Sequence, residues 1–249
     1  LLYEPIRKDD TIGSYEQQAS TPLEQDTMTI NKRAIVWDMD GVLVDSGDLH
    51  YQAWQEVARE TLGFEMTREL FDRMFGTDNA GVLRQLFGRE PTAEEVERIG
   101  GQQDQRYREL AVEGVKEVPG AFALLRSCAA DGWQQAIATS APRVTLDLIL
   151  DRFALREWFA VCVSTEDVPR AKPDPAIFLL AAERLGVPPE RCLVIEDSLN
   201  GIRAARAAGM RCLAVTTTHT PEALAEADRI VASLEEVSPE DLLALLEGE

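Results

Sequence analysis

The chain has 249 residues, of which 45% are hydrophobic and 28% charged, enough for one large domain or two modest ones with a substantial core. Its 25 basic and 44 acidic residues give a net charge of −19. This charge argues against non-specific binding to nucleic acid and against adhesion to anionic membranes, because long-range repulsion opposes both. It does not exclude an anionic small molecule, because a pocket can be positive inside a negative protein, above all where it holds a metal ion.

No segment approaches the roughly 20 consecutive apolar residues that span a bilayer, and the N-terminal residues lack the apolar run of a secretory signal. We therefore expect a cytoplasmic protein that contacts neither membrane nor nucleic acid and is a monomer or a small homo-oligomer. The four cysteines lie far apart and form no C-x-x-C pair, which favours reduced, buried cysteines over a zinc or disulfide site.

Residues 1–32 are polar and aperiodic, which predicts a flexible tail. Short, continuous apolar runs then recur along the chain, and such runs are typical of strands that are covered on both faces of a parallel sheet. The runs are 34–38, 135–139, 160–164, 192–196, 212–216 and 229–232. Helical periodicity separates or follows the later runs, at 121–131, 144–152, 175–185, 198–208 and 239–246. This alternation predicts an α/β fold with a doubly wound, Rossmann-like parallel sheet.

The segment 47–117 interrupts this alternation. It contains no strand-like run and has helical periodicity at 49–62, 68–75, 80–87 and 93–113. A crossover between parallel strands needs only about a dozen residues, so we expect 47–117 to be an inserted all-helical subdomain. The α/β core then consists of 33–46 and 118–249.

Polar side chains stand at the ends of the predicted strands. Asp38 and Asp40 follow the first strand, Thr139 and Ser140 the second, and Glu196 and Asp197 the fourth, while Lys172 precedes a helix. Ligands of open α/β sheets bind beyond the carboxyl ends of the strands, so these groups are expected to converge.

Converging carboxylates repel one another and require a cation, and oxygen ligands suit Mg²⁺. A lysine and a hydroxyl beside them could hold a phosphoryl group. A carboxylate near that phosphorus can act as nucleophile, and one two residues later as general acid and base. The D-x-D-G sequence could instead begin an EF-hand, but Val42 and Leu49 occupy positions that need acidic ligands.

Four motifs in order, VWDMDGVLVDS, IATSAP, RAKPDP and VIEDSLNG, resemble the four signatures of the haloacid dehalogenase superfamily. A lone D-x-D-G is weak evidence, whereas four motifs at predicted strand ends or in the following loops are specific. The resemblance covers about residues 33–235, and the insertion point is similar to that of the helical-cap subfamily. The sequence DGVLVDS followed by LHYQAW is most similar to the β-phosphoglucomutase-like group.

The resemblance implies a role for each matching residue. Asp38 would be the nucleophile that becomes an aspartyl phosphate and would also bind Mg²⁺. Asp40 would be the general acid and base, with its backbone carbonyl on the metal. Thr139, helped by the Ser140 backbone, would hold the phosphoryl group, and Lys172 would neutralise charge. The last motif would supply Asp197 as a metal ligand, with Glu196 as a further ligand or a neighbour of the ligands.

His50 stands where the core passes into the cap, and the related mutases have a histidine there. Contact with the substrate and a merely structural place at the hinge are equally compatible with the sequence. The related mutases also carry an arginine early in the cap and a lysine after the second motif, where this chain has Asn79 and Pro142. Arg143 or Arg84 could substitute for them.

The missing cations favour a Mg²⁺-dependent phosphatase that hydrolyses a small phosphate ester similar to a sugar phosphate. A β-phosphoglucomutase-type phosphomutase is the alternative. A third hypothesis is a non-catalytic relative that binds a phosphorylated ligand, and its signature would be a broken motif such as Asn in place of Asp38. No motif is broken here.

Overall fold

A computed structural model of the protein describes residues 32–248. Residues 1–31 of the predicted tail, together with Glu249, lie outside the described residues. No helix within 32–248 combines the length and the apolar character needed to cross a membrane.

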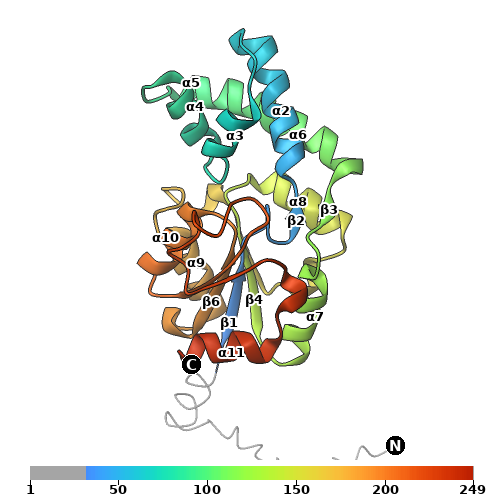
Figure 1. Cartoon of the computed structure of the whole chain (residues 1–249), viewed down its shortest axis with the longest axis vertical. Coiled ribbons are helices and arrows are strands. Elements are labelled where there is room, and N and C mark those ends of the chain that lie inside the picture. The colour runs from blue at the N-terminus through green and yellow to red at the C-terminus, as the bar shows by residue number, and fades with distance from the viewer. Residues whose placement is uncertain (1–31, 249) are drawn as a thin grey trace, which may run out of the picture. The chain divides into compact units, whose positions relative to one another are not determined.

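A six-stranded parallel sheet in the order β5-β4-β1-β6-β7-β8 forms the centre of the core. Figure 1 labels three of its strands, with β1 between β6 and β4. The strands are β1 (Ala34–Trp37), β4 (Gln134–Ala138), β5 (Val161–Val163), β6 (Cys192–Glu196), β7 (Arg211–Val215) and β8 (Arg229–Val231). The predicted doubly wound α/β class is confirmed. Every predicted strand is present, and no strand end differs by more than one residue from the corresponding apolar run.

Helices cover both faces of the sheet, which explains why the strands are apolar throughout rather than alternating. One face packs against α7 (Ala121–Ala130), α8 (Arg143–Arg152) and α11 (Pro239–Glu247), and the other against α9 (Ala176–Leu185) and α10 (Leu199–Ala207). Trp37 of β1 belongs to the first apolar cluster and Val36 to the second. Both are fully buried, as alternation along a central strand requires.

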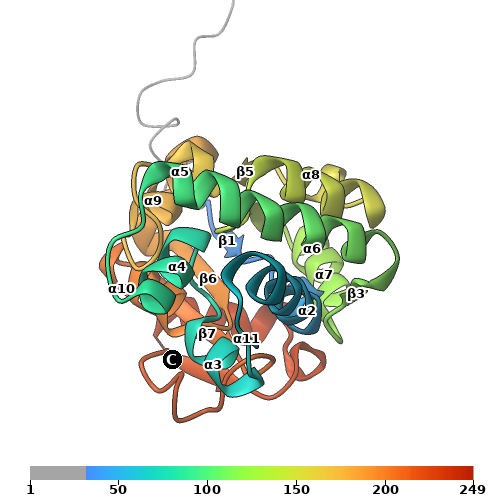
Figure 2. The ribbon, with the colours of Figure 1, turned by 90° about the horizontal axis from the view of Figure 1, so that it is seen from above.

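The inserted cap, between the short strands β2 (Val44–Asp45) and β3 (Lys116–Glu117), consists entirely of helices. It comprises α2 (Gly47–Val57), a π-helical turn (Ala58–Leu62), α3 (Arg68–Met74), α4 (Asn79–Phe87), α5 (Ala93–Glu95), a second π-helical stretch (Val96–Gly100) and α6 (Gly101–Gly114). Its own apolar cluster is separate from those of the sheet and includes Trp54, Phe71 and Leu83. Figure 2 looks down through these helices onto the sheet.

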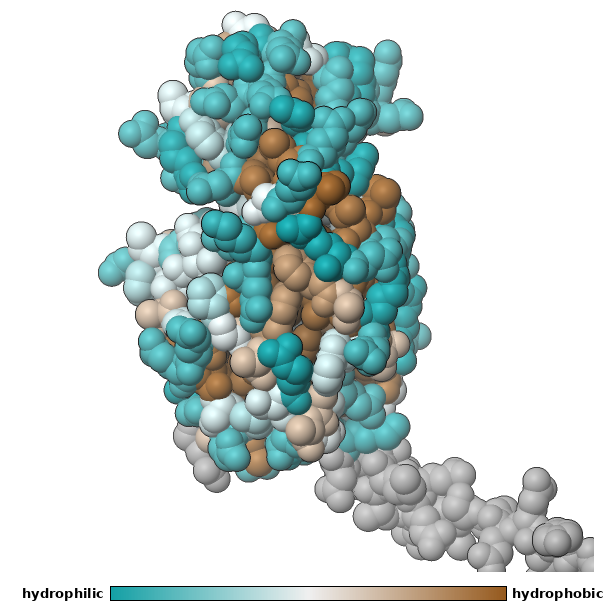
Figure 3. Space-filling view, turned by 90° about the vertical axis from the view of Figure 1, so that its right-hand side faces the viewer, coloured by the Kyte–Doolittle hydropathy of each residue, from teal (hydrophilic) through white to brown (hydrophobic). Residues whose placement is uncertain are grey.

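A two-stranded antiparallel ribbon connects cap and core, with β2 (Val44–Asp45) paired to β3 (Lys116–Glu117). The prediction that 47–117 contains no strand was wrong at this point, because a strand of two residues leaves no readable apolar pattern. Figure 3 shows a mostly hydrophilic cap surface, with apolar residues gathered where cap and core meet.

Candidate active site

The parallel register brings the predicted strand-end residues together. Trp37 is paired with Ile137 on one side and with Ile195 on the other. The next residue, Asp38, donates its backbone N–H to the Ile195 carbonyl at 3.0 Å. The carboxylate of Asp38 therefore lies beside the end of β6, where Glu196 and Asp197 stand, and Thr139 follows β4 on the other side.

Lys172 connects these residues. Its ammonium donates to Asp38 Oδ1 at 2.6 Å, to Glu196 Oε1 at 2.8 Å and to the Ala138 carbonyl at 3.1 Å. The three hydrogens of the ammonium group are thus all used. Burial alone would lower the pKa of Lys172, but the adjacent Asp38 and Glu196 carboxylates outweigh burial and raise that pKa. Lys172 is therefore a fixed positive charge at the bottom of the site.

Glu196 is held by its own loop. Its Oε2 atom accepts hydrogen bonds from the backbone N–H of Asp197 at 2.9 Å, from the N–H of Ser198 at 2.8 Å and from the Ser198 hydroxyl at 2.9 Å. A Cβ atom at Gly201 would lie 1.7 Å from Oε1, so this close approach requires glycine. Because both Glu196 oxygens already have partners, Asp197 is better placed than Glu196 to bind a cation directly.

The donor set fits a divalent cation. Asp38, Glu196 and Asp197 each offer a carboxylate oxygen, and these oxygens lie within 4.8 Å of one another. Burial, opposed by Lys172 and assisted by Glu196, raises the pKa of Asp38 to about 7. Burial and the neighbouring carboxylates raise the pKa of Asp197 well above its ordinary value. One lysine does not balance three buried carboxylates, and a hard cation such as Mg²⁺ with oxygen ligands would supply the missing charge.

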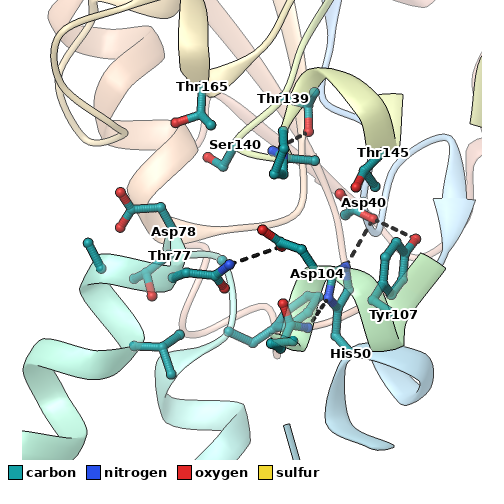
Figure 4. Close-up of a pocket in the computed structure, with 18 of the residues that line it drawn as sticks. Asp40, His50, Thr77, Asp78, Asp104, Tyr107, Thr139, Ser140, Thr145 and Thr165 are labelled. Atoms are coloured by element: carbon teal, nitrogen blue, oxygen red, sulfur yellow. Dashed lines mark hydrogen bonds and ion pairs between the residues drawn. The ribbon is translucent and has the colours of Figure 1, made fainter. Parts of the chain in front are cut away.

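Asp40 is not a member of this carboxylate cluster, and its side chain faces His50 and Tyr107 of the cap, as Figure 4 shows. Its Oδ1 atom accepts from the Ser46 hydroxyl at 2.6 Å and lies 3.4 Å from both His50 Nε2 and the Tyr107 hydroxyl. Burial alone would raise the pKa of Asp40, but the hydrogen bonds and charge of these neighbours, His50 foremost, lower it.

His50 contacts Asp40 instead of standing free at the hinge. Its ring is stacked on the Tyr107 ring at a centroid distance of 3.8 Å and an interplanar angle of 4°. Its Nδ1 atom lies 3.1 Å from the Gln103 amide nitrogen. The two ring nitrogens of His50 therefore lie between Gln103 on one side and Asp40 on the other. The sequence analysis missed Ser46, Gln103 and Tyr107, although the i, i+4 spacing of the last two on a helix was a signal.

A cavity of about 430 Å³ lies between the strand ends and the cap. All the predicted site residues line it except Arg143. Thr139 Oγ1 accepts from the Ala141 N–H at 3.0 Å, which leaves the Thr139 hydroxyl hydrogen free to donate to a ligand. Ser140 is half-buried at the rim, next to Thr139 (Figure 4).

Arg143 is not where it was predicted to be. Its guanidinium contacts Asp167 Oδ2 and donates to the Cys162 carbonyl at 3.2 Å, outside the cavity lining. Pro142 precedes α8 with an extended backbone and lines the cavity, whereas Arg143, the first residue of the helix, faces Asp167. Arg84 is likewise outside the lining, paired with Glu90 at 2.6 Å and 2.7 Å.

The loop after β7 supports Asp197, which the sequence analysis did not predict. The Thr218 hydroxyl donates to Asp197 Oδ2, and His219 Nδ1 lies 3.2 Å from the Asp197 carbonyl oxygen. The contact of His219 is thus with the backbone of a candidate metal ligand. Gly41 also packs here, because a Cβ atom at that position would lie 1.9 Å from Asp197 Oδ2.

Comparison with known proteins gives one family. The haloacid dehalogenase-like hydrolases match residues 32–209. The phosphorylated carbohydrates phosphatase of Thermotoga maritima is 33% identical over 215 residues, which cover 86% of this chain and 97% of that protein. The crystal structure of CbbY from Rhodobacter sphaeroides in complex with phosphate aligns with a TM-score of 0.76 at 30% identity, covering 85% of this chain and 99% of that one.

Another relative is much longer than this chain. The chloroplastic protein SUPPRESSOR OF QUENCHING 1 of Arabidopsis thaliana is 37% identical over 207 residues. The match covers 78% of this chain but 19% of that protein.

Proposed function

Because the chain belongs to the haloacid dehalogenase-like hydrolases, we propose that it is a Mg²⁺-dependent phosphatase that hydrolyses small phosphate monoesters through an aspartyl-phosphate intermediate. The observation that carries this proposal is the arrangement around Asp38. A buried ammonium lies 2.6 Å from one Asp38 oxygen, and Asp40 of the same loop lines the cavity and contacts His50 of the cap.

Asp38 is the proposed nucleophile. Its carboxylate attacks phosphorus, a new bond forms between the carboxylate oxygen and phosphorus, and the bond from phosphorus to the ester oxygen breaks. Lys172, fixed by its three partners, stabilises the negative charge beside the transferring group. Thr139 is the proposed hydrogen-bond donor to a phosphoryl oxygen, because its hydroxyl hydrogen is not used within the described site.

Asp40 is the proposed general acid and base. It donates a proton to the departing ester oxygen and later removes one from the water that attacks the aspartyl phosphate, which returns Asp38 and releases inorganic phosphate. The proton that Asp40 takes from water in the second step replaces the one it donates in the first, and the hydrogen bonds from Ser46 and His50 favour its carboxylate form between the two steps. Asp38, Asp197 and the backbone carbonyl of Asp40 would hold Mg²⁺, which supplies charge neutralisation and orients the phosphoryl oxygens.

A sugar phosphate or a similar metabolite is the proposed substrate class. The relatives at more than 30% identity support it, since one of them is described as a phosphatase of phosphorylated carbohydrates. A screen of phosphate release over hexose phosphates and phosphoglycolate, with and without Mg²⁺, identifies the best substrate.

A phosphomutase remains the second candidate, and the charges around the cavity argue against it. A mutase must hold a second phosphate, yet Asn79 and Pro142 line the cavity where the related mutases have cations. Substantial conversion of glucose 1-phosphate to glucose 6-phosphate, with little release of inorganic phosphate, would replace the phosphatase by the mutase.

The covalent mechanism is tested by Asp38→Asn. We expect phosphate release from an aryl phosphate in Mg²⁺ to fall on the order of 10³-fold or more, because the amide is a poor nucleophile. Asp45→Asn, at an exposed position of β2, is the matched control and should retain activity within about twofold. Equal rates for Asp38→Asn and the unmodified protein would remove both the covalent step and the non-catalytic alternative.

A further inference from the structure

The cap side of the cavity carries negative charge and apolar surface. Its acidic members are Asp78, Glu97 and Asp104, and its apolar members are Trp54, Phe71, Phe75, Val82 and Val96. The proposed phosphoryl chemistry uses none of these residues. They face the space where the alcohol part of the ester must lie, because the phosphoryl group is bound at the strand ends.

Asp104 is the best-oriented of the three acids. In Figure 4 it lies at the centre of the cavity, between Asp78 and His50. Its Oδ1 atom accepts from Asn79 Nδ2 at 2.9 Å, and the same Asn79 nitrogen donates to the Gly100 carbonyl at 3.2 Å. The second oxygen, Oδ2, has no hydrogen-bond donor within residues 32–248, so it can accept one from a ligand.

The groups of this cavity that can carry positive charge are already paired. Among the described lining residues these are Lys172 and His50. The ammonium of Lys172 has three partners, and both ring nitrogens of His50 have one. The described lining residues thus leave no unpaired cation for a second phosphate or a carboxylate on the substrate, and the negative charges of Asp104 and Asp78 would repel such a group.

Thr145 gives an independent indication of what the ligand offers. Its side chain lines the cavity near Asp40 (Figure 4), the residue is 1% exposed, and its hydroxyl has no hydrogen-bond partner among the residues that the structure describes. A buried hydroxyl without a partner is costly, and native structures seldom retain one. A hydroxyl group of a bound ligand would provide the missing partner.

We propose that the pocket selects esters with a single phosphate on an uncharged, polyhydroxylated leaving group, and that Asp104 and Thr145 determine this specificity. Asp104 accepts a hydrogen bond from one hydroxyl of the leaving group and repels a second anionic group. Thr145 binds another hydroxyl, and the apolar residues of the cap pack against the carbon skeleton. This inference rests on the proposed phosphatase function.

The first test compares fructose 6-phosphate with fructose 1,6-bisphosphate by phosphate release in Mg²⁺. We expect the unmodified protein to favour the monophosphate by at least about tenfold in kcat/KM, and Asp104→Asn to reduce that ratio at least about fivefold, because the variant keeps the shape but loses the charge. The matched control is Glu113→Gln, an exposed acid on the same helix, which should leave the ratio unchanged within about twofold.

The second test uses Thr145→Val and compares fructose 6-phosphate with phenyl phosphate, whose leaving group has no further hydroxyl. We expect the ratio of the two kcat/KM values to fall about tenfold, because only the sugar can use the Thr145 hydroxyl. The thermal midpoint should stay the same or rise, because the replaced hydroxyl had no partner. Thr61→Val, outside the cavity lining, is the control.

The outcomes separate this inference from the proposed function. The proposed specificity would be wrong if the unmodified protein prefers the bisphosphate, or if neither variant changes the ratios. Continued hydrolysis of phenyl phosphate would show in either case that the phosphatase function holds. Absence of phosphate release from all three esters would overturn the phosphatase function itself, and the specificity with it.

Discussion

The two walls of the cavity hold their charged groups in different ways. On the core wall, Lys172 is bonded to Asp38 and Glu196, and the oxygens of Asp197 lie nearby, so that the position of each charge depends on the others. On the cap wall, Asp104 has one neutral partner, Asn79, and an open oxygen. In the proposed function, the core wall binds the phosphate group and the cap wall contacts the leaving group, which differs between substrates.

The largest effect is expected from removing the positive charge of Lys172 at the centre of the core wall. Lys172→Met leaves the buried carboxylates of Asp38 and Glu196 without their counter-ion. We expect the free energy of unfolding to fall by about 3 kcal/mol and kcat/KM to fall on the order of 10³-fold, as measured by urea unfolding and by phosphate release. Lys116→Met, at an exposed position of β3, should change the free energy of unfolding by less than about 0.5 kcal/mol. A similar small change for Lys172→Met would show that the core wall is not an interdependent network.

A second variant crowds the core wall without changing its charge. Gly201→Ala places a methyl group where the Glu196 carboxylate lies, since a Cβ atom there is 1.7 Å from Oε1. We expect a loss of about 2 kcal/mol in the free energy of unfolding, because the carboxylate or the helix must shift.

Gly101→Ala is the matched control for that variant. Gly101 has a φ of −60°, and a Cβ atom there meets nothing within 4 Å, so alanine should stabilise the helix by about 0.5–1 kcal/mol. If both alanine variants unfold at the same urea concentration, Glu196 is free to move and the rigid core wall is contradicted.

The smallest effect is expected at the edge of the cavity. Arg143→Ala removes the ion pair between Arg143, whose side chain is 35% exposed, and Asp167, whose side chain is 20% exposed. We expect a cost of about 0.5–1 kcal/mol in the free energy of unfolding and a change in KM of less than about twofold, from steady-state phosphate release. A tenfold rise in KM would show that Arg143 contacts the substrate after all.

The sequence predicted the core wall well because local rules determine it. Asp38, Thr139 and Asp197 follow apolar strands directly, and parallel strands present their carboxyl ends at one edge. The doubly wound sheet follows from the same alternation of strands and helices. These features depend on spacing along the chain, which is visible without a structure.

The residues that the sequence did not predict are those whose contacts depend on tertiary packing. Tyr107 and Gln103 reach the site because α6 runs alongside α2, and Thr218 because the loop after β7 crosses Asp197. The error at Arg143 has a simpler cause. Pro142 lines the cavity just before α8 begins, whereas Arg143, the first residue of the helix, contacts Asp167, so proximity to the motif was a poor guide.

The ribbon of β2 and β3 holds the two ends of the cap together. Val44 is paired with Glu117 and Asp45 with Lys116, so the chain leaves the core and returns to it at adjacent points, as at the two ends of a hairpin turn. In terms of connectivity, the whole cap is one long loop between β2 and β3. Its length adds little to the entropic cost of loop closure, because that cost grows only with the logarithm of the number of residues. We therefore expect that exchanging, lengthening or shortening cap segments leaves the strand pairing of the sheet, and with it the positions of the strand-end residues, unchanged.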